Sequence, residues 1–284
     1  SNKNLRSAYH GIAKSFLQQV KLKPETVAVL PMGVDGQDLM DAIQSEMKVQ
    51  GSVDFSQVRF FQPFEFVPLA ISHESLIGSK FIQLWSQLPG ADIENFFCFH
   101  SDDWDTFVEE LSLDDPRKLF PRGMDTSLRN RVRPSEEDAL QEDCIQFIDA
   151  IAEQTEEKLR ELGGVDFCAQ AIGYAGRLFM NIAGSSHYSA TRLTLLNYEA
   201  MAEHATWVGG IEQARQTAAL TLGLGVLMIH PQTQLHLIGL NEEISREVKL
   251  LKNGEVSVQM PASIANRIEN AHLWYTPDSG MDLA

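Results

Sequence analysis

Five side chains are our candidates for transferring a proton or for holding an anion. Glu65 lies between two phenylalanines, and burial there would raise its pKa toward that of a general base. His73 and His187 carry imidazoles, which titrate near neutral pH. Arg177 and Arg192 carry guanidinium groups, which can bind a carboxylate or a phosphate through two parallel hydrogen bonds. We take Glu65, His73 and Arg177 as the catalytic candidates.

Each of these candidates also has a purely structural interpretation. Glu65 could cap a neighbouring helix or pair with a basic residue, and a lone histidine in a loop is usually just solvated. Arg177 could form an internal ion pair with Asp35 or Glu65. We expect no metal and no cofactor, because the histidines, cysteines and carboxylates show no spacing typical of a metal site.

The elements that would position these residues alternate between strands and helices. Short apolar runs bounded by glycine or polar residues predict strands, and apolar residues at helical spacing predict helices. The predicted strands cover residues 26–30, 58–61, 96–99, 165–172 and 234–240, and the predicted helices cover 5–20, 137–162 and 212–222, with a further helix from residue 37. This alternation predicts an α/β fold, a Rossmann-like doubly wound and mostly parallel sheet with helices on both faces.

The length of 284 residues fits one large α/β domain or two modest ones, the composition is that of a globular protein, and we expect a single domain over residues 1–284. Residues 101–134 break the alternation and are rich in Asp, Arg and Pro, so we expect a surface insertion or a lid there. With 39 acidic against 23 basic residues the net charge is −16, which argues against nucleic acid as a partner. The longest apolar run, residues 220–229, is too short to span a membrane, and no membrane association is expected.

Three widely spaced cysteines lie among apolar residues: Cys98, Cys144 and Cys168. An odd number without a Cys-x-x-Cys pair is typical of buried free thiols in a reducing compartment. The sequence also opens on a polar segment that leads into an amphipathic helix, with no signal peptide. These features predict a cytoplasmic protein.

The longest recognisable motif is residues 161–186, ELGGVDFCAQAIGYAGRLFMNIAGSS, which we call the signature segment. It resembles the signature of the glucosamine-6-phosphate isomerase and deaminase family, which also contains 6-phosphogluconolactonase-like proteins. Further matches are the Leu-Pro-Met-Gly of residues 30–33, the Thr-Arg at 191–192 and the turn of residues 219–225. The positions in register are Gly163, Gly164, Val165, Asp166, Ile172, Gly173, Gly176, Asn181, Gly184, Ser185 and Ser186. The resemblance implies the Rossmann-like fold, with a ligand cleft at the carboxyl ends of the strands.

The resemblance also indicates where the family's proton-transferring side chains would stand. At the signature its Asp, His and Glu correspond to Ala175, Arg177 and Ile182. Its other base corresponds to Phe64, so that only the adjacent Glu65 is an acid. Alanine, isoleucine and a permanently charged arginine cannot act as ordinary acid–base catalysts.

The phosphate-binding positions implied by the resemblance are changed as well. A carboxylate, Asp35, stands where the family's phosphate loop has a hydroxyl, and Glu242 and Ala205 align with its lysine and a later arginine. The cleft that the motifs imply is formed by Gly33, Asp35, Gly36, Gly173, Ala175, Gly176, Arg177, His187 and Arg192.

Three functions are compatible with this pattern. The first is a non-catalytic or regulatory relative that binds a small anionic sugar or sugar phosphate, and we favour it. The second is a divergent sugar-phosphate or sugar-acid isomerase or lactonase with a rebuilt site. The third, ordinary glucosamine-6-phosphate deamination, fits the changed side chains least well. Because members of the family commonly associate, the sequence leaves a homo-oligomer open.

Overall fold

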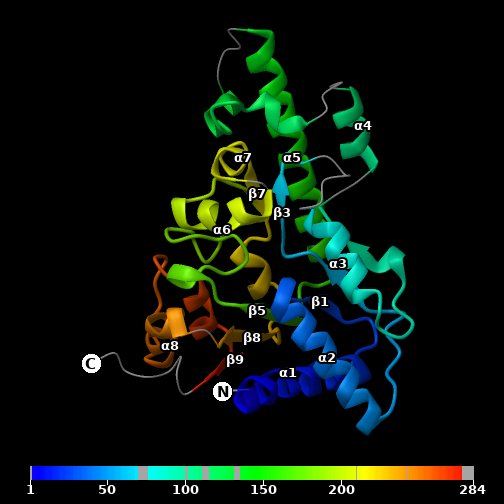
Figure 1. The fold of residues 1–284 in the computed structure, drawn as a ribbon. Coiled ribbons are helices and arrows are strands. Elements are labelled where there is room, and N and C mark those ends of the chain that lie inside the picture. The colour runs from blue at the N-terminus through cyan, green and yellow to red at the C-terminus, as the bar shows by residue number, and fades with distance from the viewer. Residues whose placement is uncertain are drawn as a thin grey trace.

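A computed structural model gives the fold of the chain (Figure 1). It describes residues 2–69, 76–99, 102–110, 115–130, 135–208, 210–240 and 242–276. The helices are α1 (Asn2–Leu22), α2 (Gly33–Gln50), α3 (Ile77–Trp85), α4 (Asp102–Glu110), α5 (Glu136–Glu161), α6 (Tyr198–Val208), α7 (Ile211–Arg215) and α8 (Ser245–Lys252). The strands are β1 (Val27–Val29), β2 (Arg59–Phe61), β3 (Phe64–Val67), β4 (Phe96–Phe97), β5 (Phe167–Ala171), β6 (Arg192–Thr194), β7 (Ala218–Thr221), β8 (Gln234–Gly239) and β9 (Asn270–Tyr275).

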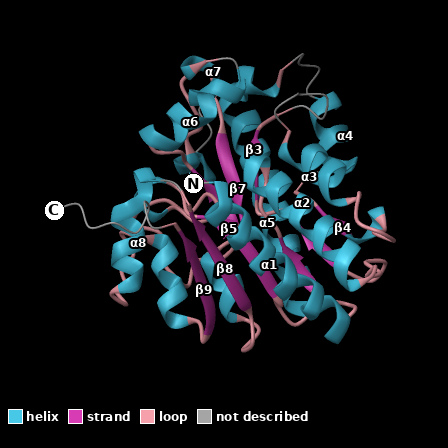
Figure 2. Cartoon of the chain, turned by 60° about the horizontal axis from the view of Figure 1, so that its bottom comes forward, coloured by secondary structure: helices cyan, strands magenta, loops and turns pink. Residues whose placement is uncertain are grey.

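The main sheet is parallel, as the alternation of strands and helices predicts. Its order is β4-β2-β1-β5-β8-β9, and every adjacent pair runs in the same direction. Figure 2 shows β9, β8 and β5 side by side, with β4 toward the opposite side of the molecule. The strand order changes direction between β1 and β5, so the sheet is doubly wound and the predicted Rossmann-like fold is confirmed.

Helices cover both faces of this sheet, because alternate side chains of each strand point to opposite sides. On one face Ala28 and Phe167 pack with the apolar side chains of α1, α2 and α3. On the other face Val29 and Cys168 pack with α5, α8 and a second, smaller sheet. In the part of the chain that the structure describes, every helix is too short or too polar to cross a membrane.

The second sheet was not expected, and it overturns one predicted helix. The order is β3-β7-β6, with antiparallel neighbours. Residues 212–222 were predicted to be a helix, but α7 ends at Arg215 and β7 begins at Ala218. Alanine and leucine favour helices, yet all four β7 residues are buried, and the strand pairs with β3 on one side and β6 on the other, so tertiary pairing outweighs their local preference.

Helix α2 begins earlier than the predicted residue 37. Its first residue, Gly33, has φ of 63°, which glycine adopts readily and which lets the chain turn from β1 directly into the helix. Asp35 and Gly36 therefore lie in the first turn of α2, and not in a free loop before it. A carboxylate in that turn interacts favourably with the positive end of the helix dipole.

Residues 101–134 carry part of the core in the ranges that are described. Trp104 of α4 is buried, and so are Leu119, Phe120 and Leu128, which pack with α5. Leu119 and Leu128 belong to two short 3-10 turns, Pro116–Leu119 and Thr126–Asn130, and Phe120 follows the first of them. A function for this segment as a lid stays a prediction.

Candidate functional site

The signature segment forms β5 and the loop that leaves its carboxyl end. The loop turns back at once, since the N–H of Gly173 donates to the carbonyl of Arg177 at 2.9 Å. Ala175 and Phe179 have φ of 55° and 54°, which is unusual for residues with a Cβ. Asn181 is fully buried and holds the far end, donating from Nδ2 to the carbonyls of Leu178 at 3.2 Å and Leu222 at 2.8 Å.

Arg177 lies folded back on its own loop. Its Nη1 donates to the carbonyl of Phe179 at 3.2 Å and contacts the sulfur of Met180 at 3.0 Å. The guanidinium covers Gly173 so closely that a Cβ there would be 2.9 Å from Nε and Nη2. The alternative ion pair of Arg177 with Asp35 or Glu65 is absent from the described residues, in which both carboxylates have other partners.

A small recess lies beside the guanidinium, and it has little free space. Ala175, Arg177 and Ile182 line it, together with residues of α6 and the loop before it. Its volume is about 10 Å³, which is close to the space that one water molecule requires. The three positions that the family resemblance marks for acid–base side chains therefore surround a nearly filled recess.

Glu65 caps a helix, as its structural interpretation predicts. Its Oε1 accepts from the backbone N–H groups of Phe66 and Ile77, both at 2.9 Å. Its Oε2 accepts from the N–H of Gly78 at 2.7 Å and from Nε2 of Gln62 at 2.9 Å. Burial raises the pKa of Glu65, while these four donors act in the opposite direction. Since Ile77 and Gly78 begin α3, the carboxylate satisfies N–H groups that no residue within the helix can reach.

Asp35 is bound from α1. The hydroxyl of Tyr9 donates to its carboxylate, and burial is the main cause that raises the pKa of Asp35. Burial also raises the pKa of Tyr9, with the negative charge of Asp35 adding to the effect. In this arrangement Asp35 joins α2 to α1.

Arg192 and His187 contact different parts of the molecule. Nη1 of Arg192 donates to Oδ1 of Asn181 at 2.8 Å, and its Nη2 donates to the Ser185 hydroxyl at 3.1 Å, so β6 is tied to the signature segment. Nε2 of His187 lies 3.3 Å from the Ser263 hydroxyl. His187 is buried, and burial followed by the charge of Arg267 lowers its pKa. His73 lies outside the described residues.

The thiols behave as the sequence predicts, being free and largely buried. Cys144 and Cys168 are buried and Cys98 is half-buried. Burial raises the pKa of Cys98 and of Cys144 to about 12. The described residues contain no cluster of histidines, cysteines and carboxylates that could hold a metal ion.

Two polar residues of this region were missed by sequence reasoning. Tyr9 binds Asp35 from another helix, and no local signal links the two positions. Gln170 is buried in β5, and its Nε2 has no hydrogen-bond partner in the part of the chain that the structure describes. A polar residue within an otherwise apolar strand is the signal that could have drawn attention to Gln170.

Comparison of the sequence with known proteins gives partial matches of one kind. No family model matches the sequence. A glucosamine-6-phosphate deaminase of Mycolicibacterium smegmatis is 34% identical over 109 residues, which cover 38% of this chain and 41% of the relative. One of Thermoanaerobacter pseudethanolicus is 23% identical over 252 residues, covering 89% and 81%. The chain thus matches less than half the length of the first relative.

Solved structures match over nearly the whole chain. A structure described as a monomeric glucosamine-6-phosphate deaminase superposes with a TM-score of 0.73 at 16% identity, covering 97% of this chain and 95% of the other. The 6-phosphogluconolactonase from Trypanosoma cruzi gives a TM-score of 0.61 at 12% identity, covering 98% and 94%. At these identities the superpositions establish the fold, and the likeness in sequence is to the named deaminases. The chain is thus a divergent relative of glucosamine-6-phosphate deaminases in sequence, and it has the fold that these enzymes share with 6-phosphogluconolactonases.

Proposed function

We propose that this chain is a non-catalytic or regulatory relative, which binds a small anionic sugar or sugar phosphate without deaminating it. One observation carries the proposal. The recess in the signature loop has about 10 Å³ of free space, and the three positions that would supply acid–base groups are Ala175, Arg177 and Ile182. Isomerisation of an amino-sugar phosphate moves protons between carbon and oxygen, and these side chains cannot move them.

The surviving acid supports the same proposal. A general base needs a carboxylate oxygen that can reach the substrate's proton. Both oxygens of Glu65 accept two hydrogen bonds each, three of the four from backbone N–H groups. Moving Glu65 toward a substrate would leave the first N–H groups of α3 without an acceptor, so this carboxylate serves the fold.

Arg177 is the group that would recognise the ligand. Its guanidinium is half-buried at the carboxyl end of β5, where ligands of doubly wound folds bind. A planar guanidinium suits a phosphate or a sugar carboxylate, which it can bind through two parallel hydrogen bonds. Because the recess beneath it is filled, the anionic group would lie against the outer side of Arg177. We also propose that the chain acts in the cytoplasm and assembles into a homo-oligomer.

The test is thermal stability in the presence of glucosamine 6-phosphate, 6-phosphogluconate, glucosamine, gluconate and a nucleotide. Ligand binding to the native state raises the melting temperature by mass action. We expect a rise with a phosphorylated or acidic sugar, its loss in Arg177→Ala, and no change in Arg215→Ala, an arginine on the exposed side of α7. Release of ammonia from glucosamine 6-phosphate at an enzymatic rate would disprove the non-catalytic part of the proposal.

The second candidate is a divergent isomerase or lactonase that uses a rebuilt site of Glu65, His73 and Arg177. The positively charged guanidinium of Arg177 favours this second candidate, since an arginine in place of the family's histidine suits an anionic substrate. Its test is lactone hydrolysis and sugar-phosphate isomerisation by the purified chain. If an activity is found and survives replacement of all three side chains together, the rebuilt site is the wrong explanation.

A further inference from the structure

The main sheet ends at β4, and no strand among the described residues pairs with the outer edge of β4. The carbonyl of Phe97 accepts from the N–H of Gln62 in the next segment at 3.0 Å, so the backbone of Phe97 faces β2. Backbone groups of successive strand residues point to opposite sides, and those of Phe96 and Cys98 therefore point away from the sheet. Among the described residues, the N–H of Cys98 and the carbonyls of Phe96 and Cys98 have no hydrogen-bond partner.

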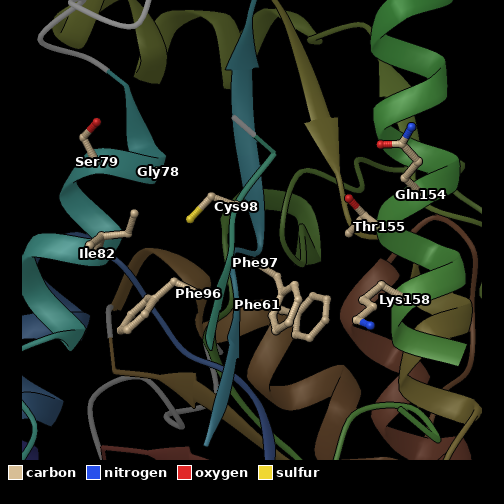
Figure 3. Close-up of a pocket in the computed structure, with 10 residues that line it drawn as sticks. All are labelled: Phe61, Gly78, Ser79, Ile82, Phe96, Phe97, Cys98, Gln154, Thr155 and Lys158. Atoms are coloured by element: carbon tan, nitrogen blue, oxygen red, sulfur yellow. The ribbon is translucent and has the colours of Figure 1, made fainter. Parts of the chain in front are cut away.

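A pocket lies along this edge, between two helices that stand on either side of it. Figure 3 shows α3 with Ser79 and Ile82 on one side, α5 with Gln154 and Lys158 on the other, and Cys98 between them. Its volume is about 330 Å³. One residue of an added strand occupies about 160 Å³, which is the product of the rise per residue, the spacing between neighbouring strands and the spacing between packed layers. The pocket therefore has room for about two extended residues, which matches the length of edge over which backbone groups are free.

The two sides of the pocket differ in charge. Apolar side chains lie on both sides, with Ile82 and Phe96 toward α3 and the stacked rings of Phe61 and Phe97 toward α5. On the α5 side lies Lys158, which is the pocket's charged lining residue within the described part of the chain. Lys158 pairs with Glu161 at 3.2 Å, but the two side chains are 44% and 66% exposed, and a pair so open to solvent contributes little to stability. The ammonium group is therefore available to a carboxylate in the pocket.

We propose that the outer edge of β4 is a docking site for an extended peptide of another protein, which adds to the sheet as a further strand and places an acidic side chain next to Lys158. Backbone hydrogen bonds to Phe96 and Cys98 hold the peptide, as in other cases of strand addition. Because successive side chains of a strand point to opposite sides, a peptide whose acidic side chain points toward α5 directs the residues before and after it toward Ile82, and we expect those residues to be apolar. The site is separate from the signature loop and does not rest on the function proposed above.

A second copy of this chain fits the pocket less well. Its own β4 edge would bring another Lys158 and no lining carboxylate, and each copy carries a net charge of −16. Like charges brought together across a strand pair are destabilising. Self-association is nevertheless a measurable outcome, and it would identify a different occupant.

Cys98 provides the assay, because it lines the pocket while Cys144 and Cys168 are buried in the core. The probe is acetyl-Thr-Val-Asp-Val-Thr-amide, and the readout is the alkylation rate of Cys98, mapped by mass spectrometry. With a dissociation constant of about 1 mM, 5 mM peptide should slow alkylation about sixfold. Alkylation of Cys144 and Cys168 reports unfolding and should remain negligible.

Two changes to the probe separate strand addition from other binding. Methylating the amide nitrogen of the central Asp removes one backbone donor of the peptide and should abolish protection. Replacing that Asp by Lys reverses the charge of the side chain and should also abolish protection. In the Lys158→Glu variant the Lys peptide should protect and the Asp peptide should not. Lys48→Glu, a change on the exposed side of α2, should leave the wild-type preference unchanged.

Three results would overturn the proposal. Absence of protection by the Asp peptide would show that the edge does not accept a strand. Equal protection by the methylated peptide would show that backbone pairing is not involved. Protection that grows with protein concentration in the absence of peptide, together with dimer in sedimentation experiments, would show that a second copy occupies the site.

Discussion

The structural assignment of Glu65 makes a quantitative prediction for Glu65→Gln. Oε1 accepts from Phe66 and Ile77, and Oε2 accepts from Gly78 and Gln62. The glutamine amide presents one oxygen and one NH2 group, and the NH2 group must face one of these two pairs of donors. Whichever way the amide turns, two hydrogen bonds are lost and two donors are left without an acceptor.

Each hydrogen bond to a charged group contributes about 1.5–3 kcal/mol, so the loss of two gives about 3–6 kcal/mol. Because glutamine carries no charge, the substitution also removes the cost of burying a carboxylate, which offsets part of this loss. We therefore expect a loss at the lower end, about 3 kcal/mol, from the free energy of unfolding. For a chain of this size this corresponds to a fall in the melting temperature of about 6–12 °C.

The assay is thermal and urea unfolding followed by circular dichroism, with Glu153→Gln as the matched control on an exposed face of α5. The control should change the free energy of unfolding by less than about 0.5 kcal/mol. Amide exchange should also become faster at Ile77 and Gly78, where α3 begins. If Glu65→Gln lowers the melting temperature no more than Glu153→Gln does, the carboxylate does not hold α3 and its assignment as a cap is wrong.

Three further predictions concern His236, Gly223 and Gly173. Burial, followed by the nearby His272, lowers the pKa of His236 to about 3, so the unfolded chain takes up a proton near pH 6.5 that the folded chain refuses. Stability should therefore fall as pH falls, by about 2 kcal/mol between pH 7 and 5, and urea titrations of His236→Gln should lack this contribution. Gly223→Ala should cost at least about 3 kcal/mol, because a Cβ would lie 2.1 Å from the backbone oxygen of Ser189, and wild-type unfolding behaviour would contradict this. Gly173→Ala should cost less than about 1 kcal/mol in the same assay, because the Cβ would meet the movable guanidinium of Arg177 and not a backbone atom.

Local sequence signals were sufficient for five strands of the main sheet, but they missed β9 and were insufficient for the contacts at the candidate site. The strands β1, β5 and β8 are apolar runs between polar or glycine residues, and burial on both faces produces that pattern whatever the rest of the chain does. In contrast, the residues of β7 favour a helix when considered alone, and only pairing with β3 and β6 makes them a strand. Pairing of distant segments leaves no periodic signal in a single sequence.

The same limit applied to the two carboxylates of the candidate site. Whether Glu65 was a base or a cap depended on the position of Ile77, twelve residues along the chain. Whether Asp35 faced a ligand depended on Tyr9, which lies 26 residues away in α1. In both cases the sequence supplied the chemical alternatives, and long-range packing decided between them.

The signature positions that match the family and those that differ have different physical tasks. Asp166 accepts from the N–H of Val27 at 2.8 Å and from Lys23 at 2.9 Å, which joins β5 to β1. Gly164 leaves no room for a Cβ, which would lie 2.8 Å from the N–H nitrogen of His230, and Asn181 closes the signature loop. These residues hold or accommodate backbone groups of other segments, and replacing them would lower the stability of this chain.

The positions that differ have side chains that face the recess and hold no backbone group of another segment in place. Ala175 and Ile182 fall in this class, and their replacement by other residues would leave the sheet and its connections intact. A chain under selection for a family's catalytic activity keeps the positions that hold the backbone and those that face the recess. A chain under selection for the fold and a different function keeps only the positions that hold the backbone. The proposed loss of deaminase chemistry is therefore compatible with a signature that is still easy to recognise, because most of that signature encodes the fold.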